Sequence, residues 1–430
     1  MAHDEQPEIA IVGGGIAGLG LAIGLLSRGI KPTIYERTPV LREIGAAIGF
    51  SKAGEWAMGV LDPRLPQLFK SIMTVTKGAS MTWVDGQTDK TTWVRPPQCK
   101  VVNTCHRVPL VDGMAKLIPP EVFRYNKKLV SIVDDPANAK VQLKFSDGTI
   151  ATADIVIGCD GVKSAVKRLL FGDASAATYS GKYAFRALLP LDKAKAIMGD
   201  GKATNQVIHI GPDSHIFSCN IGDRYLNIVA YRTDLAPWPD PEKVTATTTK
   251  ADAMAGFETF PTIRKIIEML PDELERWGIF DTVEKPPRSY TKGRVCIAGD
   301  AAHAMGPYMG TGAGLAIEDA AVLATLIGKV VKDSKSVSRN NDQSVLLRAA
   351  LQAYNDTRMP RTRWVAANAR LVGEMLEWQN PEVGKDYEKM AHEVEWRVDT
   401  NWNFDVGAML AEAEQHYLMK SRAMLPSARL

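Results

Sequence analysis

The chain has 430 residues, more than one hydrophobic core usually holds, so we expect two interlocked or adjacent domains. Hydrophobic residues make up 45% and charged residues 23%, which is ordinary for a globular protein and excludes extensive disorder. The formal net charge is only +3 and no cluster of Lys and Arg stands out, so nucleic acid is not an expected partner.

The segment 8–36 predicts a strand, a glycine turn, a helix and a second strand, which together form a βαβ unit. The apolar run 9–26 within it is long enough to be considered for a membrane span. Its six glycines and the acidic residues Asp4, Glu5 and Glu8 argue against insertion or export, since a secretory signal begins with basic residues. We therefore expect no membrane span.

A GxGxxG pattern, formed by Gly13, Gly15 and Gly18, stands between the first predicted strand and its helix. Glycines there let a pyrophosphate approach the free N–H groups of the helix N-terminus. Glu36 closes the second strand eighteen residues after Gly18, where a carboxylate accepts hydrogen bonds from ribose hydroxyls and repels a 2′-phosphate. The pattern favours the adenosine of FAD or NAD. The alternative is that the glycines only allow close helix packing and Glu36 is a solvated end residue.

Two further buried strands are predicted at 153–161 and 293–301, so three separate segments feed one parallel sheet. Between them, alternating residues around Asp147 and Gly148 predict an antiparallel hairpin. Alternation continues through 182–232 and predicts an inserted antiparallel sheet.

The polar stretch 331–345 is predicted to be a surface loop between helices, and the chain is predicted to be helical from about 346. The sequence has five cysteines, an odd number, which are widely spaced and form no CxxC pattern. This argues against a disulfide framework or a metal site, and it favours a reducing, cytoplasmic location.

The stretch GDAAHAMGPYMGTGAGLAIEDA, residues 299–320, supplies the contacts that the rest of a flavin needs. Asp300 follows a strand and can accept hydrogen bonds from a polyol chain, and Pro307 can cover one face of a ring. The glycines 310–314 expose N–H groups at a helix start, which suit the negative charge on the pyrimidine edge of a reduced flavin.

The segments VGGGIAGL, CDGVKSAVK and GDAAHAMGPYMGTGAGLAIEDA resemble the three sequence signatures of single-component, FAD-dependent aromatic hydroxylases. Within that family the chain is most similar to fungal salicylate-hydroxylase-like monooxygenases of polyketide pathways, some of which oxidatively dearomatise phenols. The resemblance covers nearly the whole chain and includes the segments 41–50, 105–107, 183–191 and 401–410. It implies a Rossmann-like α/β FAD-binding domain with an inserted antiparallel-sheet substrate domain and a helical C-terminal region.

The resemblance also implies the domain boundaries and the cofactor contacts. The FAD-binding domain is expected at 1–75, 102–181 and 282–385, the substrate domain at 76–101 and 182–281, and the C-terminal region at 386–430. The expected cofactor contacts are Glu36 for the adenosine ribose, Gly49 and Arg107 for the FAD backbone, Asp300 for the ribityl chain, and Gly312 and Ala313 for the pyrimidine edge. Asp160 and Gly161 match a motif thought to help both FAD and NAD(P)H binding, although a capping Asp at a strand-to-loop turn is the alternative interpretation.

The implied chemistry is a monooxygenation in which NAD(P)H reduces FAD, O2 forms a C4a-hydroperoxide, and an electron-rich aromatic carbon takes up one oxygen. No second GxGxxG pattern is present, which fits a transiently docked NAD(P)H. The pattern does not distinguish NADH from NADPH, and the resemblance favours NADPH. Arg186 is the candidate catalytic residue that holds the substrate as a phenolate, although it can equally pair with a carboxylate at a sheet edge.

Some relatives pair that arginine with a tyrosine, whereas Cys219 stands at the matching position here; Tyr183, Tyr225, Tyr231 and Tyr308 are the possible substitutes. His303 is either structural or a general base. Other functions stay open: a salicylate-type decarboxylative hydroxylase, a flavin dehydrogenase or reductase, a non-catalytic flavin-binding protein, and an NAD-linked dehydrogenase. We expect a small aromatic substrate and a monomer or homodimer.

Overall fold

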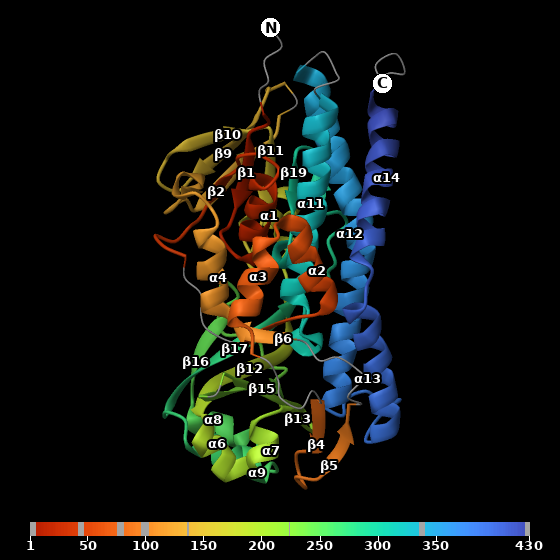
Figure 1. Ribbon diagram of the computed structural model, residues 1–430. Coiled ribbons are helices and arrows are strands. Elements are labelled where there is room, and N and C mark those ends of the chain that lie inside the picture. The colour runs from red at the N-terminus through yellow and green to blue at the C-terminus, as the bar shows by residue number, and fades with distance from the viewer. Residues whose placement is uncertain are drawn as a thin grey trace.

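The computed structural model describes residues 6–41, 47–74, 81–95, 103–135, 137–222, 224–334 and 340–425. Figure 1 shows two regions along the long axis of the molecule, one around a parallel sheet and the other around a larger, mainly antiparallel sheet. The last three helices run alongside both regions.

The first sheet has six strands in the order β18-β19-β11-β1-β2-β7. Its strands are β1 (Ile9–Val12), β2 (Thr33–Tyr35), β7 (Phe123–Arg124), β11 (Ile155–Gly158), β18 (Thr291–Lys292) and β19 (Val295–Ile297). Strand β1 pairs in parallel with β2 and β11, and β11 pairs in parallel with β19. Every residue of β1, β11 and β19 is buried, as expected of parallel strands. The prediction that three separate segments feed one parallel sheet is confirmed.

Helix α1 (Ile16–Leu26) follows β1 and packs against α11 (Gly312–Ser334). A Cβ added at Gly24 would lie 2.9 Å from the side chain of Ala324, so glycine is needed for this close contact. The apolar run 9–26 is thus divided between a buried strand and a buried helix of eleven residues. Among the described helices, none has the length and apolar character that a membrane crossing requires.

The predicted hairpin is confirmed. Strands β8 (Leu129–Val133), β9 (Val141–Phe145) and β10 (Ile150–Ala153) form a small antiparallel sheet. The turn between β9 and β10 carries Gly148 at a φ of 83°, which glycine adopts without strain. Two more strands, β3 (Ala47–Phe50) and β6 (Asn103–His106), form a separate antiparallel pair.

The second large sheet has eight strands in the order β16-β17-β12-β15-β14-β13-β4-β5. Its strands are β4 (Met81–Asp85), β5 (Thr91–Val94), β12 (Thr178–Pro190), β13 (Gln206–Gly211), β14 (Ser214–Ile221), β15 (Tyr225–Thr233), β16 (Thr245–Thr249) and β17 (Glu273–Asp281). The antiparallel meander predicted for 182–232 is confirmed. One sheet face packs against the short helices α6 (Leu191–Met198), α7 (Asp200–Ala203), α8 (Lys250–Ala255) and α9 (Pro261–Glu268).

The remaining helices connect and cover these sheets. They are α2 (Lys52–Leu61), α3 (Arg64–Ile72), α4 (Arg107–Lys116), α5 (Ala165–Phe171), α10 (Asp300–His303), α12 (Asn340–Leu376), α13 (Tyr387–Trp402) and α14 (Val406–Met424), with single 3-10 turns at Pro120–Val122, Asp173–Ser175 and Pro307–Met309. The helical C-terminal region predicted from about residue 346 is confirmed.

The predicted loop at 331–345 is wrong within the described residues. Helix α11 continues to Ser334 and α12 begins at Asn340, while residues 335–339 lie outside the described residues. Asp333, near the end of α11, is ion-paired with Lys329 one turn earlier and accepts a hydrogen bond from Tyr417 of α14. Polar composition therefore marked an exposed helix face.

Candidate active site

The glycine turn after β1 has two glycines that the backbone requires and one that faces open space. Gly13 has a φ of 106°, and a Cβ there would lie 2.4 Å from the carbonyl oxygen of Cys159. A Cβ at Gly18 would lie 2.1 Å from the carbonyl oxygen of Gly13. Gly15 caps α1 and has nothing within 4 Å of its Cβ position. The open side at Gly15 therefore leaves room for a phosphate at the helix N-terminus.

Glu36 lies at the end of β2 beside this turn. Its Oε2 accepts a hydrogen bond from the Gly14 N–H at 2.8 Å, and its Oε1 accepts from the Thr38 N–H at 3.0 Å and hydroxyl at 2.9 Å. Each carboxylate oxygen offers two lone pairs, so Oε2 can accept one further hydrogen bond from a ligand. A cavity of about 280 Å³ lies beside Glu36 and the glycine turn and extends to Asp160 and Gly161. The residues present fit the adenosine half of FAD.

Asp160 caps a helix. Its carboxylate accepts hydrogen bonds from the Ser164 hydroxyl at 2.5 Å and from the N–H groups of Ala165 at 2.7 Å and Val166 at 3.0 Å. Burial raises its pKa, and these hydrogen bonds oppose the shift. The capping interpretation therefore accounts for the carboxylate. Gly161, at a φ of 77° with nothing near its Cβ position, lines the cavity.

The flavin segment, residues 299–320, begins where β19 ends. Gly299 adopts a φ of 62° and is followed by Asp300, which is exposed and makes no hydrogen bond to the described part of the chain. Gly312, at the start of α11, has nothing within 4 Å of its Cβ position, and the first N–H groups of a helix lack partners within it. A free carboxylate and an open helix start fit a ribityl chain and a flavin ring edge. Pro307 lies between them in a 3-10 turn.

The β3-β6 pair carries the two other predicted FAD contacts. Gly49 of β3 pairs with Thr104 of β6, and Arg107 follows β6 as the first residue of α4. A Cβ at Gly54 of the following helix would lie 3.2 Å from the Cα of Gly314, so this unit packs against the start of α11. The fold therefore brings Gly49 and Arg107 to the same side as the flavin segment.

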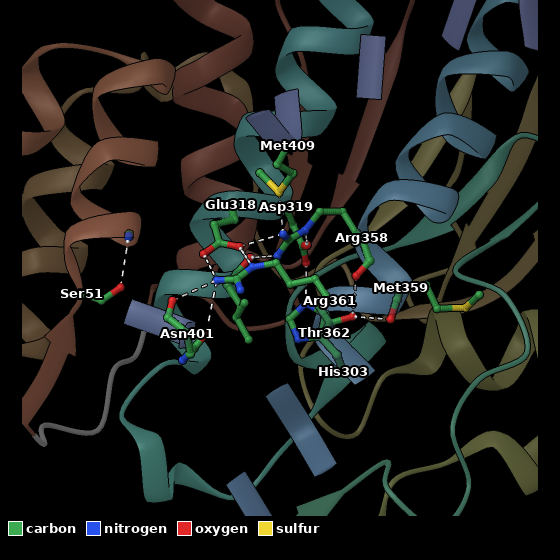
Figure 2. Close-up of polar contacts among 12 residues, drawn as sticks. Ser51, His303, Glu318, Asp319, Arg358, Met359, Arg361, Thr362, Asn401 and Met409 are labelled. Carbon is green, nitrogen blue, oxygen red and sulfur yellow. Dashed lines mark hydrogen bonds and ion pairs between the residues drawn. The ribbon is translucent and has the colours of Figure 1, made fainter. Parts of the chain in front are cut away.

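The acidic pair Glu318 and Asp319, near the end of the flavin segment, is buried in an ion-pair network (Figure 2). Arg358 of α12, with no exposed surface, donates from Nε to Asp319 Oδ1 and from a terminal nitrogen to Glu318 Oε2, both at 2.7 Å. Arg361 donates to both Glu318 oxygens at 2.7 and 2.8 Å. Asp319 Oδ2 in turn accepts from the Gly299 N–H at 2.8 Å. The network anchors the backbone that leads into Asp300.

His303 belongs to this network. Its Nε2 lies 2.6 Å from Asp319 Oδ2, the side chain is 1% exposed, and its Nδ1 has no hydrogen-bond partner among the described residues. Burial alone would raise the pKa of Asp319, but the charges of His303 and Arg358 hold it well below its usual value. The geometry favours the structural interpretation of His303. Sequence reasoning missed Arg358, since nothing in its local pattern distinguishes it from a surface arginine.

Arg186 lies on the second sheet, on the face toward the flavin segment. It pairs with Val229 of β15, and Val229 clusters with Tyr231 and with Tyr308 of the flavin segment. Within the described residues its guanidinium makes no hydrogen bond or ion pair, and it lies 4.8 Å from the ring centre of Trp277. Burial lowers its pKa, the nearby Tyr231 opposes this shift and Arg107 adds to it. Glu275 also opposes the shift, but no carboxylate of the described residues forms an ion pair with Arg186. A partly buried cation of this kind is suited to bind an anionic ligand.

A second cavity, of about 700 Å³, lies between α5, the start of β12 and residues 235–242. Lys167 lines it and is 2% exposed, and its ammonium group forms no ion pair with a carboxylate of the described residues. Burial lowers its pKa to about 8. The walls of both cavities include Lys163 and Arg168, so the second cavity adjoins the first.

Comparison with known proteins agrees with this arrangement. The FAD binding domain family matches residues 6–341. The dual trans-enoyl reductase/FAD-dependent monooxygenase tazHJ of Aspergillus terreus is 45% identical over 417 residues, which cover 94% of this chain and 60% of that protein. The FAD-dependent monooxygenase orf3 of Aspergillus niger is 40% identical over 428 residues, 96% of this chain and 97% of that protein. The solved structure of a salicylate hydroxylase substrate complex has a TM-score of 0.81 at 25% identity and covers 95% of this chain and 98% of its own.

The fold and the glycine-rich site are those of a flavoprotein whose Rossmann-like domain carries FAD. The chain belongs to the FAD binding domain family and is an FAD-dependent monooxygenase of the aromatic hydroxylase type.

Proposed function

We propose that the protein hydroxylates a phenolic, polyketide-derived aromatic substrate, with NADPH as reductant and O2 as the source of oxygen. FAD supplies the redox chemistry when bound, transferring electrons from the reductant to oxygen. The observation that carries the proposal is Arg186, a partly buried guanidinium without an anionic partner in the described chain, on the sheet face that meets the flavin segment.

Arg186 is proposed to hold the phenol as its phenolate, the electron-rich form that accepts oxygen. For a separation of about 4 Å and an effective dielectric constant of about 20, the attraction is about 4 kcal/mol. One pKa unit corresponds to about 1.4 kcal/mol, so this attraction lowers a phenol pKa by about two to three units. Such a shift leaves a typical phenol ionised near neutral pH.

The proposed FAD contacts are groups of the site that face open space or that can still form hydrogen bonds. Gly13, Gly15 and Gly18 admit the pyrophosphate, and Glu36 accepts from the adenosine ribose. The ribityl chain would meet Asp300, and the flavin edge would meet the N–H groups of Gly312 and Ala313, with Pro307 against the ring. Gly49 and Arg107 would contact the FAD backbone. The domain boundaries predicted from the sequence are retained as part of this proposal.

The reductant is proposed to dock in the second cavity. Asp160 and Gly161 line the first cavity, the next residues 162–164 line the second, and Lys167 offers a buried ammonium group to a phosphate. A transient site of this kind agrees with the absence of a second GxGxxG pattern in the sequence.

The test is mass spectrometry of products formed from FAD, NADPH, O2 and a panel of salicylates, resorcylic aldehydes and bicyclic polyketide phenols. We expect a product that gains one oxygen atom, labelled when 18O2 is supplied. Loss of CO2 would instead indicate the decarboxylative reaction, and oxidation without 18O a dehydrogenase. Arg186→Ala is expected to retain FAD and to lose at least tenfold in kcat/KM for the phenol. Unchanged turnover by this variant would contradict the role of Arg186.

A further inference from the structure

The pairing of the strands shows which of the four candidate tyrosines lie near Arg186 and which do not. Tyr183 lies on the opposite sheet face, in the cluster that packs against α6, α8 and α9. Tyr225 is 45% exposed at a strand end. Tyr231 and Tyr308 remain on the face that carries Arg186. The sequence could not separate these candidates, because the face of each depends on strand register.

Of these two, Tyr231 lies on the strand next to that of Arg186. Tyr231 pairs with Ala184, two residues before Arg186 on β12, so the two side chains are diagonal neighbours on one face. The charge of Arg186 acts on the Tyr231 phenol and the phenol on Arg186. Tyr308 lies instead against α12, where a Cβ added at Gly373 would lie 2.7 Å from its ring, and the largest electrostatic influences on its pKa come from Glu377, Tyr231, Asp281 and Arg370.

The ring of Tyr231 is held on two sides. It stacks on His215 with ring centres 4.5 Å apart and planes 16° apart, and Tyr308 meets it edge-on at 5.4 Å. His215 is fixed in turn, because its Nδ1 lies 2.9 Å from Oε1 of the buried Glu377. Glu377 reaches this sheet from the end of α12 and is ion-paired with Lys182. A ring so enclosed presents its hydroxyl with little loss of conformational freedom on binding.

The hydroxyl of Tyr231 is available. It makes no hydrogen bond to the described residues although the side chain is only 7% exposed. Burial raises its pKa to about 12, so it is a donor at neutral pH. Cys219 lies on the same face, but a thiol is a weak donor, and its sulfur lies 4.0 Å from Asn227 Nδ2.

We infer that Tyr231 donates a hydrogen bond to the phenolate oxygen that Arg186 binds, and so replaces the tyrosine whose place Cys219 has taken. This inference rests on the proposed function. Tyr231 is then a substrate-contacting residue, whereas His215 and Glu377 are positioning residues that hold its ring.

The test uses 2,4-dihydroxybenzaldehyde, whose phenolate absorbs at longer wavelength than the neutral phenol, bound to the oxidised, FAD-loaded enzyme. The pH at which the bound aldehyde ionises is measured by difference spectroscopy. We expect a lower midpoint than in free solution for the wild type, and a midpoint raised by about one to two pH units, or ten- to a hundredfold in phenolate affinity, for Tyr231→Phe. Affinity for the neutral phenol at low pH should change little.

Tyr308→Phe is the matched control, since it removes a hydroxyl from the same ring cluster without removing one that faces Arg186. Its midpoint should equal that of the wild type, and FAD content and melting temperature report whether each variant is folded. A Tyr231→Phe midpoint equal to the wild type, or an equal shift in Tyr308→Phe, overturns the assignment while the proposed function stands. If the aldehyde bound to the wild type ionises at the same pH as in free solution, the protein does not stabilise the phenolate. That result would contradict the proposed function as well.

Discussion

Replacing Arg358 with methionine tests how the flavin segment is held. Methionine keeps much of the side-chain volume but removes the hydrogen bonds to Asp319 and Glu318, both 2.7 Å long. Glu318 would keep its two bonds from Arg361, whereas Asp319 would keep only His303 and the Gly299 N–H. Removing one partner of a buried ion pair costs about 3–5 kcal/mol, because the other charge is left uncompensated. We expect the free energy of unfolding to fall by about that amount.

The assay is urea unfolding of the FAD-free protein at pH 7, followed by circular dichroism. Arg361→Met is the matched control: Glu318 stays paired with Arg358, Asp319 is untouched, and the loss should be less than half as large. The affinity for FAD, measured by quenching of flavin fluorescence, should fall more in Arg358→Met, because Asp319 holds the backbone before Asp300. Equal losses of stability in the two variants would refute the reasoning.

The same network gives a dependence on pH. The pKa of Asp319 is lower in the folded protein than its ordinary value of 3.8, since His303 and Arg358 outweigh the effect of burial. A carboxyl with a depressed folded pKa stabilises the protein above its unfolded pKa, and that stability is lost as the pH falls through the folded value. The penalty of Arg358→Met should therefore shrink below about pH 4. A penalty that stays constant from pH 7 to pH 3 would argue against a charged Asp319.

Two further predictions concern the cavities. Lys167→Met should raise the KM for NADPH about tenfold or more without altering FAD affinity, because it removes a buried charge from the second cavity. In the wild type, the KM for NADPH should rise as the pH passes above about 8, where Lys167 loses its proton. An unchanged KM would place the reductant elsewhere. Gly15→Ala should fold normally yet bind FAD more weakly, since its Cβ meets only open space. By contrast, Gly18→Ala should destabilise the FAD-free protein, as its Cβ would lie 2.1 Å from a backbone oxygen. Thermal melting with and without FAD separates the two effects.

Features that depend on residues close together in the chain were predictable. The strand, turn and helix around Gly13 follow from a local pattern, and so does the hairpin at Gly148. The three segments that form the parallel strands were also predictable, because each is a short apolar run that ends in a glycine turn. The stretch 331–345 shows the limit of such reasoning: polar composition is shared by loops and exposed helix faces, and only packing against α14 distinguishes them.

The sequence by itself thus determined the strands of the parallel sheet, the glycine turn and the cofactor class. Each of these is encoded in short contiguous motifs, in which apolar strand residues are followed by glycines with the required backbone geometry. Tertiary structure alone decided which distant side chains meet. Arg358 reaches Asp319 across 39 residues, and nothing near either residue in the chain indicates the pairing. Tyr183 and Tyr231 both occupy predicted strands, yet strand register puts one against helices and the other beside Arg186. The physical reason is that a side chain's face is set by pairing with strands far along the chain, and a buried charge is stabilised by whichever partner the fold brings to it.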